Sequence, residues 1–152
     1  MEFIEGEKEA GCIFCTRLAR QNDREDLILH RADHCAVFLN KYPYSHGHLM
    51  VVPRQHTDSL GELSAETSAE IMTQLAAWSD LMRNKMKAEG FNVGVNLGKA
   101  AGAGIEHHVH FHLVPRWVGD TNFMPMLAET KVLSEALLAT YDKLKAAKPV
   151  GS

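Results

Sequence analysis

The chain has 152 residues, 45% of them hydrophobic and 23% charged, a balance typical of a globular domain that excludes a largely disordered chain. The net charge of -3 argues against general nucleic-acid binding, which usually needs a basic surface. No apolar run approaches the ~18 residues that cross a bilayer, so we expect no membrane partner. The length fits one domain over residues 1–152.

Three cysteines, two of them in a Cys-x-x-Cys pair, indicate a reducing compartment and a metal site more than a disulfide framework. The acidic residues 1–10 lack the apolar segment of a signal peptide. We therefore expect a cytoplasmic protein. Nine histidines are unevenly distributed, and their clustering is the main lead to function.

The elements predicted first along the chain are a short helix and three strands. The helix lies within residues 11–21, beginning at the cysteine pair. Strands are predicted at residues 27–30 and 35–39, and the short gap between them is typical of a hairpin. A third strand follows at residues 48–53, after a turn-rich stretch.

The longest helix is predicted next. Ser64 is a good N-cap, and Thr67 with Glu70 has capping-box spacing if the helix begins later. Gly90 stands where the helix should end. Apolar side chains recur along one face at helical spacing, at Ile71, Leu75, Trp78 and Met82.

Two more strands, at residues 91–97 and 108–114, precede a C-terminal helix. The apolar face of that helix carries Leu133, Leu137, Tyr141 and Leu144. The order strand-strand-strand-helix-strand-strand-helix predicts an α+β fold. We expect an antiparallel five-stranded sheet with one long helix and a C-terminal helix.

Three histidines alternate with apolar residues in the last predicted strand. His108, His110 and His112 fall on one face of such a strand, and Val109, Phe111 and Leu113 fall on the core face. A row of surface histidines or a purification tag would not interleave apolar residues in register. The row suits a metal site, because neutral imidazole is a common ligand, or covalent catalysis at phosphorus. An imidazole with the ordinary pKa near ~6.5 is largely neutral and nucleophilic at pH 7.

Residues 108–114 resemble the signature of the histidine-triad family. Residues 47–53, followed by His56, resemble the Gly-His-x-Leu-Val-x-Pro segment of that family. Residues 91–104 resemble the strand and glycine-rich loop that lead to the triad. The resemblance covers a motif-bearing core of about residues 12–117 and implies the histidine-triad fold, with residues 118–152 as a C-terminal extension.

The resemblance implies a nucleotidyl hydrolase or transferase that acts on an α-phosphorus bearing AMP. His110 is then the nucleophile, and His112 contacts the phosphates and assists the leaving group. His108 lies beside the nucleophile, and His48 supports the row of histidines from the neighbouring strand. Residues 117–126 resemble the branch of dinucleoside polyphosphate hydrolases and phosphorylases. Two alternatives stay open: a non-catalytic nucleotide-binding regulatory module, and a metal-dependent phosphoester hydrolase that uses the histidine row as ligands.

Several further residues match positions that contact the nucleotide in the family. They are Ile13, Phe14 and Phe38 in the base pocket, Asn40 at the ribose and Asn96 on the phosphate side. Independently of the resemblance, the glycine-rich loop that contains Gly102 and Gly104 can offer backbone N–H groups to phosphate oxygens, and a plain turn is the alternative for it. Core packing is the alternative for the three apolar residues, and turn capping is the alternative for both asparagines.

Some family members bind a structural zinc, and the resemblance assigns its ligands here to Cys12, Cys15, His56 and His108. The alternative is a pair of reduced thiols beside ordinary histidines. No organic cofactor is expected. The resemblance also implies a homodimer formed through the long helix and an adjacent strand.

The other cysteine and histidines receive no role in chemistry. Cys35 is expected to be a small core residue, and His107 to point off the face of the triad. His30, His34 and His46 are expected at the surface or in turns.

Overall fold

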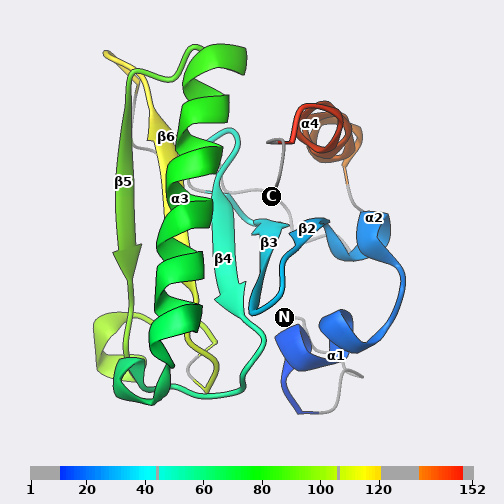
Figure 1. Cartoon of the computed structure of the whole chain (residues 1–152). Helices are drawn as coiled ribbons and strands as arrows, with labels where there is room; N and C mark the ends of the chain where they lie inside the picture. The colour runs from blue at the N-terminus through cyan, green and yellow to red at the C-terminus, as the bar shows by residue number, and fades with distance from the viewer. Residues whose placement is uncertain (1–10, 44, 106, 121–133, 149–152) are drawn as a thin grey trace.

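A five-stranded antiparallel sheet forms the centre of the molecule, as predicted (Figure 1). This computed structural model describes residues 11–43, 45–105, 107–120 and 134–148. The strands lie side by side in the order β2-β3-β4-β6-β5, and every neighbouring pair is antiparallel. Their bounds are Ile28–Arg31 (β2), Cys35–Leu39 (β3), Leu49–Pro53 (β4), Gly90–Val95 (β5) and Phe111–Arg116 (β6).

The helices pack against the sheet and beside its β2 edge (Figure 1). The long helix α3 runs along one face of the sheet, and α4 packs beside β2. Among the described residues, no helix is both long and apolar enough to cross a membrane. The bounds are Ile13–Ala19 (α1), Asp23–Asp26 (α2), Ala65–Lys85 (α3) and Glu135–Ala146 (α4), with short 3₁₀ turns at Leu60–Glu62 (η1) and Lys99–Ala101 (η2).

The start of α3 is the predicted one, but its end is not. The Ser64 hydroxyl accepts a hydrogen bond from the Thr67 N–H at 3.0 Å, so the earlier of the two possible starts is confirmed. The helix ends at Lys85, because Lys87 takes a left-handed backbone conformation with φ of 58°. Gly90 does not terminate the helix but opens β5.

The C-terminal helix is confirmed over Glu135–Ala146. Leu133, which was expected on its apolar face, lies outside the described residues. The same holds for most of the segment 117–126 on which the resemblance to one branch of the family rested.

The two faces of the sheet carry separate cores, because side chains alternate along each strand. On the face that α3 covers, strand residues such as Val37, Leu49 and Leu113 pack against Trp78. The core of the opposite face contains Phe14 of α1 with Ile28, Ala36, Phe38 and Val52. The face on which Phe14 packs also carries the functional histidines described below.

His30 is buried, so the expectation of a surface histidine was wrong; its side chain is 5% exposed. A register shift between Ile28 and His30 places His30 opposite Val37, on the side covered by α3 and α4. Burial lowers the pKa of His30, and the nearby lysines of the α4 end lower it further. His34 and His46 are exposed, as predicted.

Tyr141 fastens α4 to the sheet. Its side chain is buried, and its hydroxyl donates a hydrogen bond of 2.7 Å to the carbonyl oxygen of Ile28. Burial is the main reason why the pKa of Tyr141 rises to about 12. Nearby, Arg24 and Asp142 form a two-bond ion pair, but both side chains are exposed, so this pair adds little stability.

We expect Tyr141→Phe to lower the free energy of unfolding by about 1–3 kcal/mol, because the buried Ile28 carbonyl loses its donor while the ring still fills its place. Urea denaturation followed by circular dichroism measures this loss. The control is Lys143→Ala, an exposed site on the same helix, with an expected change within about 0.5 kcal/mol. An unchanged midpoint in Tyr141→Phe would show that this bond does not hold the helix.

Candidate functional site

Four histidines gather on the sheet face opposite α3. His112 lies in β6 opposite Met50, which packs against the core of that face. His108 and His110 lie in the segment just before β6, so the strand begins three residues later than predicted. The segment is nevertheless held in place, because the N–H of Val109 donates to the Thr57 carbonyl at 2.8 Å. The predicted alternation of the three histidines therefore holds, although His108 and His110 lie before the first residue of β6.

The ring of His110 is held in one orientation by the backbone. Its Nδ1 lies 2.9 Å from the carbonyl oxygen of His108. A carbonyl only accepts, so Nδ1 carries the proton and Nε2 keeps a lone pair. The ring is 6% exposed and packs beside the rings of His112 and Phe14, with centroids 5.0 and 5.2 Å away. The free Nε2 is the nitrogen that can act as a nucleophile.

His48 and His112 are joined by a hydrogen bond between their rings. The Nε2 of His48 lies 2.8 Å from the Nδ1 of His112, so the two rings share one proton in a hydrogen bond. The amide nitrogen of Asn40 lies 3.5 Å from the Nδ1 of His48 and donates to it, which leaves the proton of neutral His48 on Nε2. That amide is oriented by its own oxygen, which accepts from the N–H of Tyr42 at 2.9 Å. Asn40, at the end of β3, thus joins the histidine group.

Burial keeps these imidazoles neutral. It lowers the pKa of His48 to about 3, with a further contribution from repulsion by His112 and His110. It lowers the pKa of His112 to about 4, and His110 adds to the shift. The pKa of His110 is also lowered by burial, although the hydrogen bond to the His108 carbonyl opposes the shift. At pH 7 the Nε2 of His110 is therefore unprotonated.

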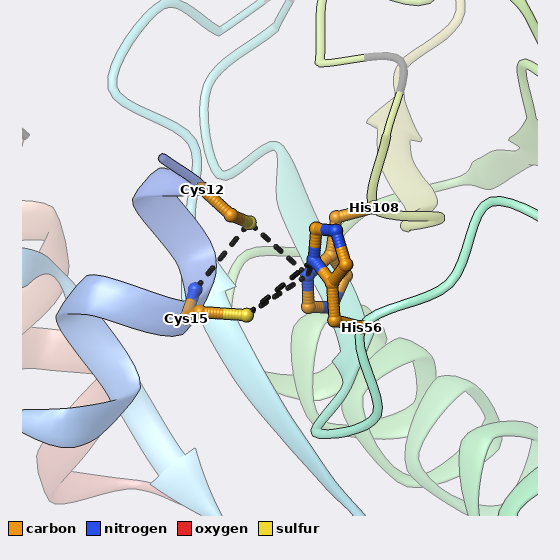
Figure 2. Close-up of side chains that lie close together, drawn as sticks. All are labelled: Cys12, Cys15, His56 and His108. Carbon is orange, nitrogen blue, oxygen red and sulfur yellow. Dashed lines mark hydrogen bonds between the residues drawn. The ribbon is translucent and has the colours of Figure 1, made fainter. Parts of the chain in front are cut away.

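The predicted metal ligands come together from three parts of the chain (Figure 2). Cys12 and Cys15 come from the first turn of α1, His56 follows β4, and His108 precedes β6. One ligand atom from each residue lies within 4.8 Å of the others. The Nδ1 of His108 is 3.2 Å from the Cys12 sulfur, 3.7 Å from the Cys15 sulfur and 3.3 Å from the Nδ1 of His56.

These separations fit zinc. Tetrahedral Zn²⁺, with Zn–S near ~2.3 Å and Zn–N near ~2.0 Å, places its ligand atoms about 3.3–3.8 Å apart. The Nε2 of His108 lies 2.8 Å from the Pro53 carbonyl and must donate to it, which leaves the lone pair on the Nδ1 that faces the thiols. Burial raises the pKa of the Cys15 thiol, and Cys12 raises it further, a cost that a bound cation would offset.

The predicted nucleotide contacts are placed less uniformly. Phe14 and Phe38 are each 1% exposed and lie in the core of the sheet face that carries the histidine row, which is called the triad face below. Their rings meet edge to face with centroids 5.3 Å apart. Ile13 is half-buried beside them. Asn96 is half-buried and directly follows Val95, which pairs with Phe111 at the start of β6. Gly102 ends the η2 turn with a positive φ of 91°, and Gly104 is exposed in the same loop.

Two backbone carbonyl groups that position the site could not be predicted from the sequence. Pro53 holds the ring of His108, and Thr57 holds the segment that bears the triad. Every residue type has a carbonyl, so nothing in the sequence marks these two. The contact of Phe14 with the triad was also missed, because its helical position was assigned to the base pocket.

Comparisons with known proteins show the family to which the chain belongs. The chain is 39% identical over 125 residues to "AP-4-A phosphorylase" of Mycobacterium tuberculosis, covering 82% of this chain but only 64% of that protein's length. It is 34% identical over 113 residues to an uncharacterised HIT-like protein of Saccharolobus solfataricus, covering 74% of this chain and 79% of that one.

Among solved structures, a Zn-bound histidine triad family protein from Mycobacterium smegmatis superposes with a TM-score of 0.67 at 27% identity. The match covers 91% of this chain and 98% of that one. The family model described as the HIT domain matches residues 21–118, which include the histidine row and the strand that carries His112. The chain therefore belongs to the HIT domain family.

Proposed function

We propose that this chain is an enzyme, a nucleotidyl hydrolase or transferase that cleaves dinucleoside polyphosphates or related AMP conjugates through a covalent nucleotidyl-His110 intermediate. One observation carries the proposal: the His108 carbonyl binds the Nδ1–H of His110 and leaves Nε2 unprotonated in a buried site. The similarity to "AP-4-A phosphorylase" supports the choice of substrate class.

In the first step the Nε2 lone pair of His110 attacks the α-phosphorus. A P–N bond forms, and the P–O bond to the departing polyphosphate breaks, so the leaving oxygen takes the electron pair. The Nδ1–H bond to the His108 carbonyl stabilises the positive charge that develops on the ring. In the second step water or inorganic phosphate attacks the same phosphorus and forms a P–O bond, the P–N bond breaks, and Nε2 recovers its lone pair. When water attacks, its proton is released to the solvent.

The His48–His112 pair assists the leaving group in this proposal. Because the Nδ1 of His48 accepts from the Asn40 amide, its Nε2–H donates to the Nδ1 of His112, and the proton of neutral His112 resides on Nε2. That N–H can then donate to a phosphate oxygen. His48 is buried and held in place by the core, whereas His112 is partly exposed. The hydrogen bond between them therefore fixes the orientation of a ring that substrate can reach.

The nucleotide pocket is proposed on the same face. Ile13, with Phe14 and Phe38 behind it, forms the wall beside the base, and Asn40 binds the ribose. Asn96, Gly102 and Gly104 surround the phosphates, where backbone N–H groups of a glycine-rich loop bind anions well.

Of the two alternatives, the metal-dependent hydrolase has less support. Among the described residues, the group able to hold a metal contains His108 but neither His110 nor His112. The non-catalytic module predicts nucleotide binding without turnover, and the next experiment separates it from the enzyme.

We expect His110→Ala to abolish turnover of diadenosine tetraphosphate while nucleotide binding remains, because the nucleophile is lost and the pocket is kept. Product analysis with and without inorganic phosphate measures turnover and distinguishes phosphorolysis from hydrolysis. Mass spectrometry of a quenched reaction should find one added AMP on wild-type protein and none on the variant.

The control for this variant is His34→Ala, an exposed histidine in the turn between β2 and β3 whose side chain belongs to neither the histidine row nor the metal ligands, and it should keep full activity. Full activity of His110→Ala would contradict the mechanism. Binding without any turnover by the wild-type protein would favour the regulatory module.

We also propose that Cys12, Cys15, His56 and His108 bind one structural zinc ion. When bound, the metal supplies a cross-link that ties α1 to the segment before β6. A reducing compartment such as the cytoplasm would keep both thiols available for it.

Protein purified without added metal or histidine-affinity resin should contain near-stoichiometric zinc by elemental analysis. Cys12→Ser or His56→Ala should lower the zinc content sharply and lower the melting temperature, since each removes a ligand. His34→Ala should keep its zinc. A metal-free protein whose melting is unchanged by a chelator would contradict the site.

We further propose a homodimer through the β5 edge and the adjoining face of α3. β5 is an edge strand, and Val93 on it is 56% exposed although its register partner Leu113 is buried in the core under α3. Met72 on α3 is also exposed. A second copy that pairs with this edge would cover both the apolar surface and the open backbone groups.

The wild-type protein should have the mass of a dimer at micromolar concentration by light scattering. Val93→Asp should yield monomers, because a buried charge at a strand-to-strand contact is costly. Lys143→Asp on α4, at the other edge of the sheet, should leave the mass unchanged. A monomeric wild-type protein would contradict the proposal.

A further inference from the structure

Given the proposed function, on which this inference rests, we propose that Phe14 is a positioning residue for the nucleophile. Its ring holds the imidazole of His110 in the orientation for attack, and the Cys12–Cys15 turn of α1 holds Phe14 in place.

Phe14 contacts both the proposed nucleophile His110 and the candidate metal ligand His108. Its ring centroid lies 5.2 Å from that of His110 and 5.3 Å from that of His108. A third ring, that of Phe38, meets it edge to face. With 1% of its surface exposed, Phe14 offers no area to a nucleotide base, and its contacts are with the site's own rings.

A hydrogen bond alone leaves the nucleophile incompletely fixed. The second side-chain torsion of histidine is broad and roughly two-fold, so the ring can rock or turn over about the bond that attaches it. The Nδ1–H bond to the His108 carbonyl holds one edge of the His110 ring. The rings of Phe14 and His112, packed against it, restrict the remaining rotation and keep Nε2 directed at one place.

The position of Phe14 depends in turn on α1, a helix of seven residues. A helix this short is marginal without tertiary anchors. Its two thiols flank Phe14 in the chain and turn toward His56 and His108, while Phe14 turns into the core of the triad face. The four residues 12–15 therefore join the metal group and the nucleophile through one helical turn.

This role differs from a contact with the base. A base contact would change substrate binding and would depend on which base is present. A positioning residue changes the rate of nucleotidyl transfer for every base, because His110 attacks the same phosphorus in each substrate.

The test is Phe14→Leu, which keeps an apolar side chain but removes the ring. In single-turnover experiments, the rate of nucleotidyl-His110 formation should fall about 10- to 100-fold, while KM changes by less than about 2-fold. The fall should be the same for diadenosine and diuridine tetraphosphate. The matched control is Ile28→Val, a similar loss of volume in the same core cluster at a residue outside the proposed machinery, with a change of less than about 2-fold.

A second readout does not require activity. Long-range ¹H–¹⁵N spectra of the histidine rings, recorded at pH 8 and assigned with His110→Ala, should show only the Nδ1–H form of His110 in wild-type and Ile28→Val protein. Phe14→Leu should show a mixture of ring forms while keeping the wild-type zinc content.

An unchanged His110 spectrum in Phe14→Leu would overturn the inference, as would a loss confined to KM, a loss that differs between the two bases, or an equal loss in Ile28→Val. If wild-type protein turns over no nucleotide, the proposed function fails, and the ring spectra still decide whether Phe14 holds His110.

Discussion

The hydrogen bond from the Nε2–H of His108 to the Pro53 carbonyl sets the arrangement of the whole site. It fixes which nitrogen of a fully buried ring is protonated and so directs the Nδ1 lone pair toward Cys12, Cys15 and His56. It also ties the end of β4 to the segment before β6, and the carbonyl of that same His108 accepts from His110. His108 thus turns its side chain to the candidate metal ligands and its carbonyl to the ring of His110, the proposed nucleophile.

The division of the sheet into two faces explains how such a small domain holds a reactive group. The face under α3 is packed with aliphatic residues and Trp78, and it stabilises the fold. The other face combines a small apolar cluster around Phe14 with the histidine row. Burial on that face does two things at once, because it adds to the core and it keeps the imidazoles neutral at pH 7.

The histidine row could be predicted from the sequence because side-chain alternation is a local property, whereas the metal ligands, which are distant in the chain, were implied by the resemblance to the family. Alternation placed His108, His110 and His112 on one face even though β6 begins only at Phe111. Features set by distant partners could not be predicted. His30 turns inward at a register shift between β2 and β3, and Phe14 meets the triad only because α1 packs on that face. Neither residue type nor spacing carries that information.

The structure also separates the metal group from the reaction. A tetrahedral ion bound by these two thiols and two imidazoles would have all four positions filled, with none left for water or substrate. His110, two residues along the chain, turns its Nδ1 to the His108 carbonyl and contributes no atom to the group. A cation held there would therefore act on the nucleophile only by fixing His108 and the α1 turn. In the proposed mechanism the bond to phosphorus is made by the Nε2 of His110, which the hydrogen bond from Nδ1 to the His108 carbonyl leaves unprotonated.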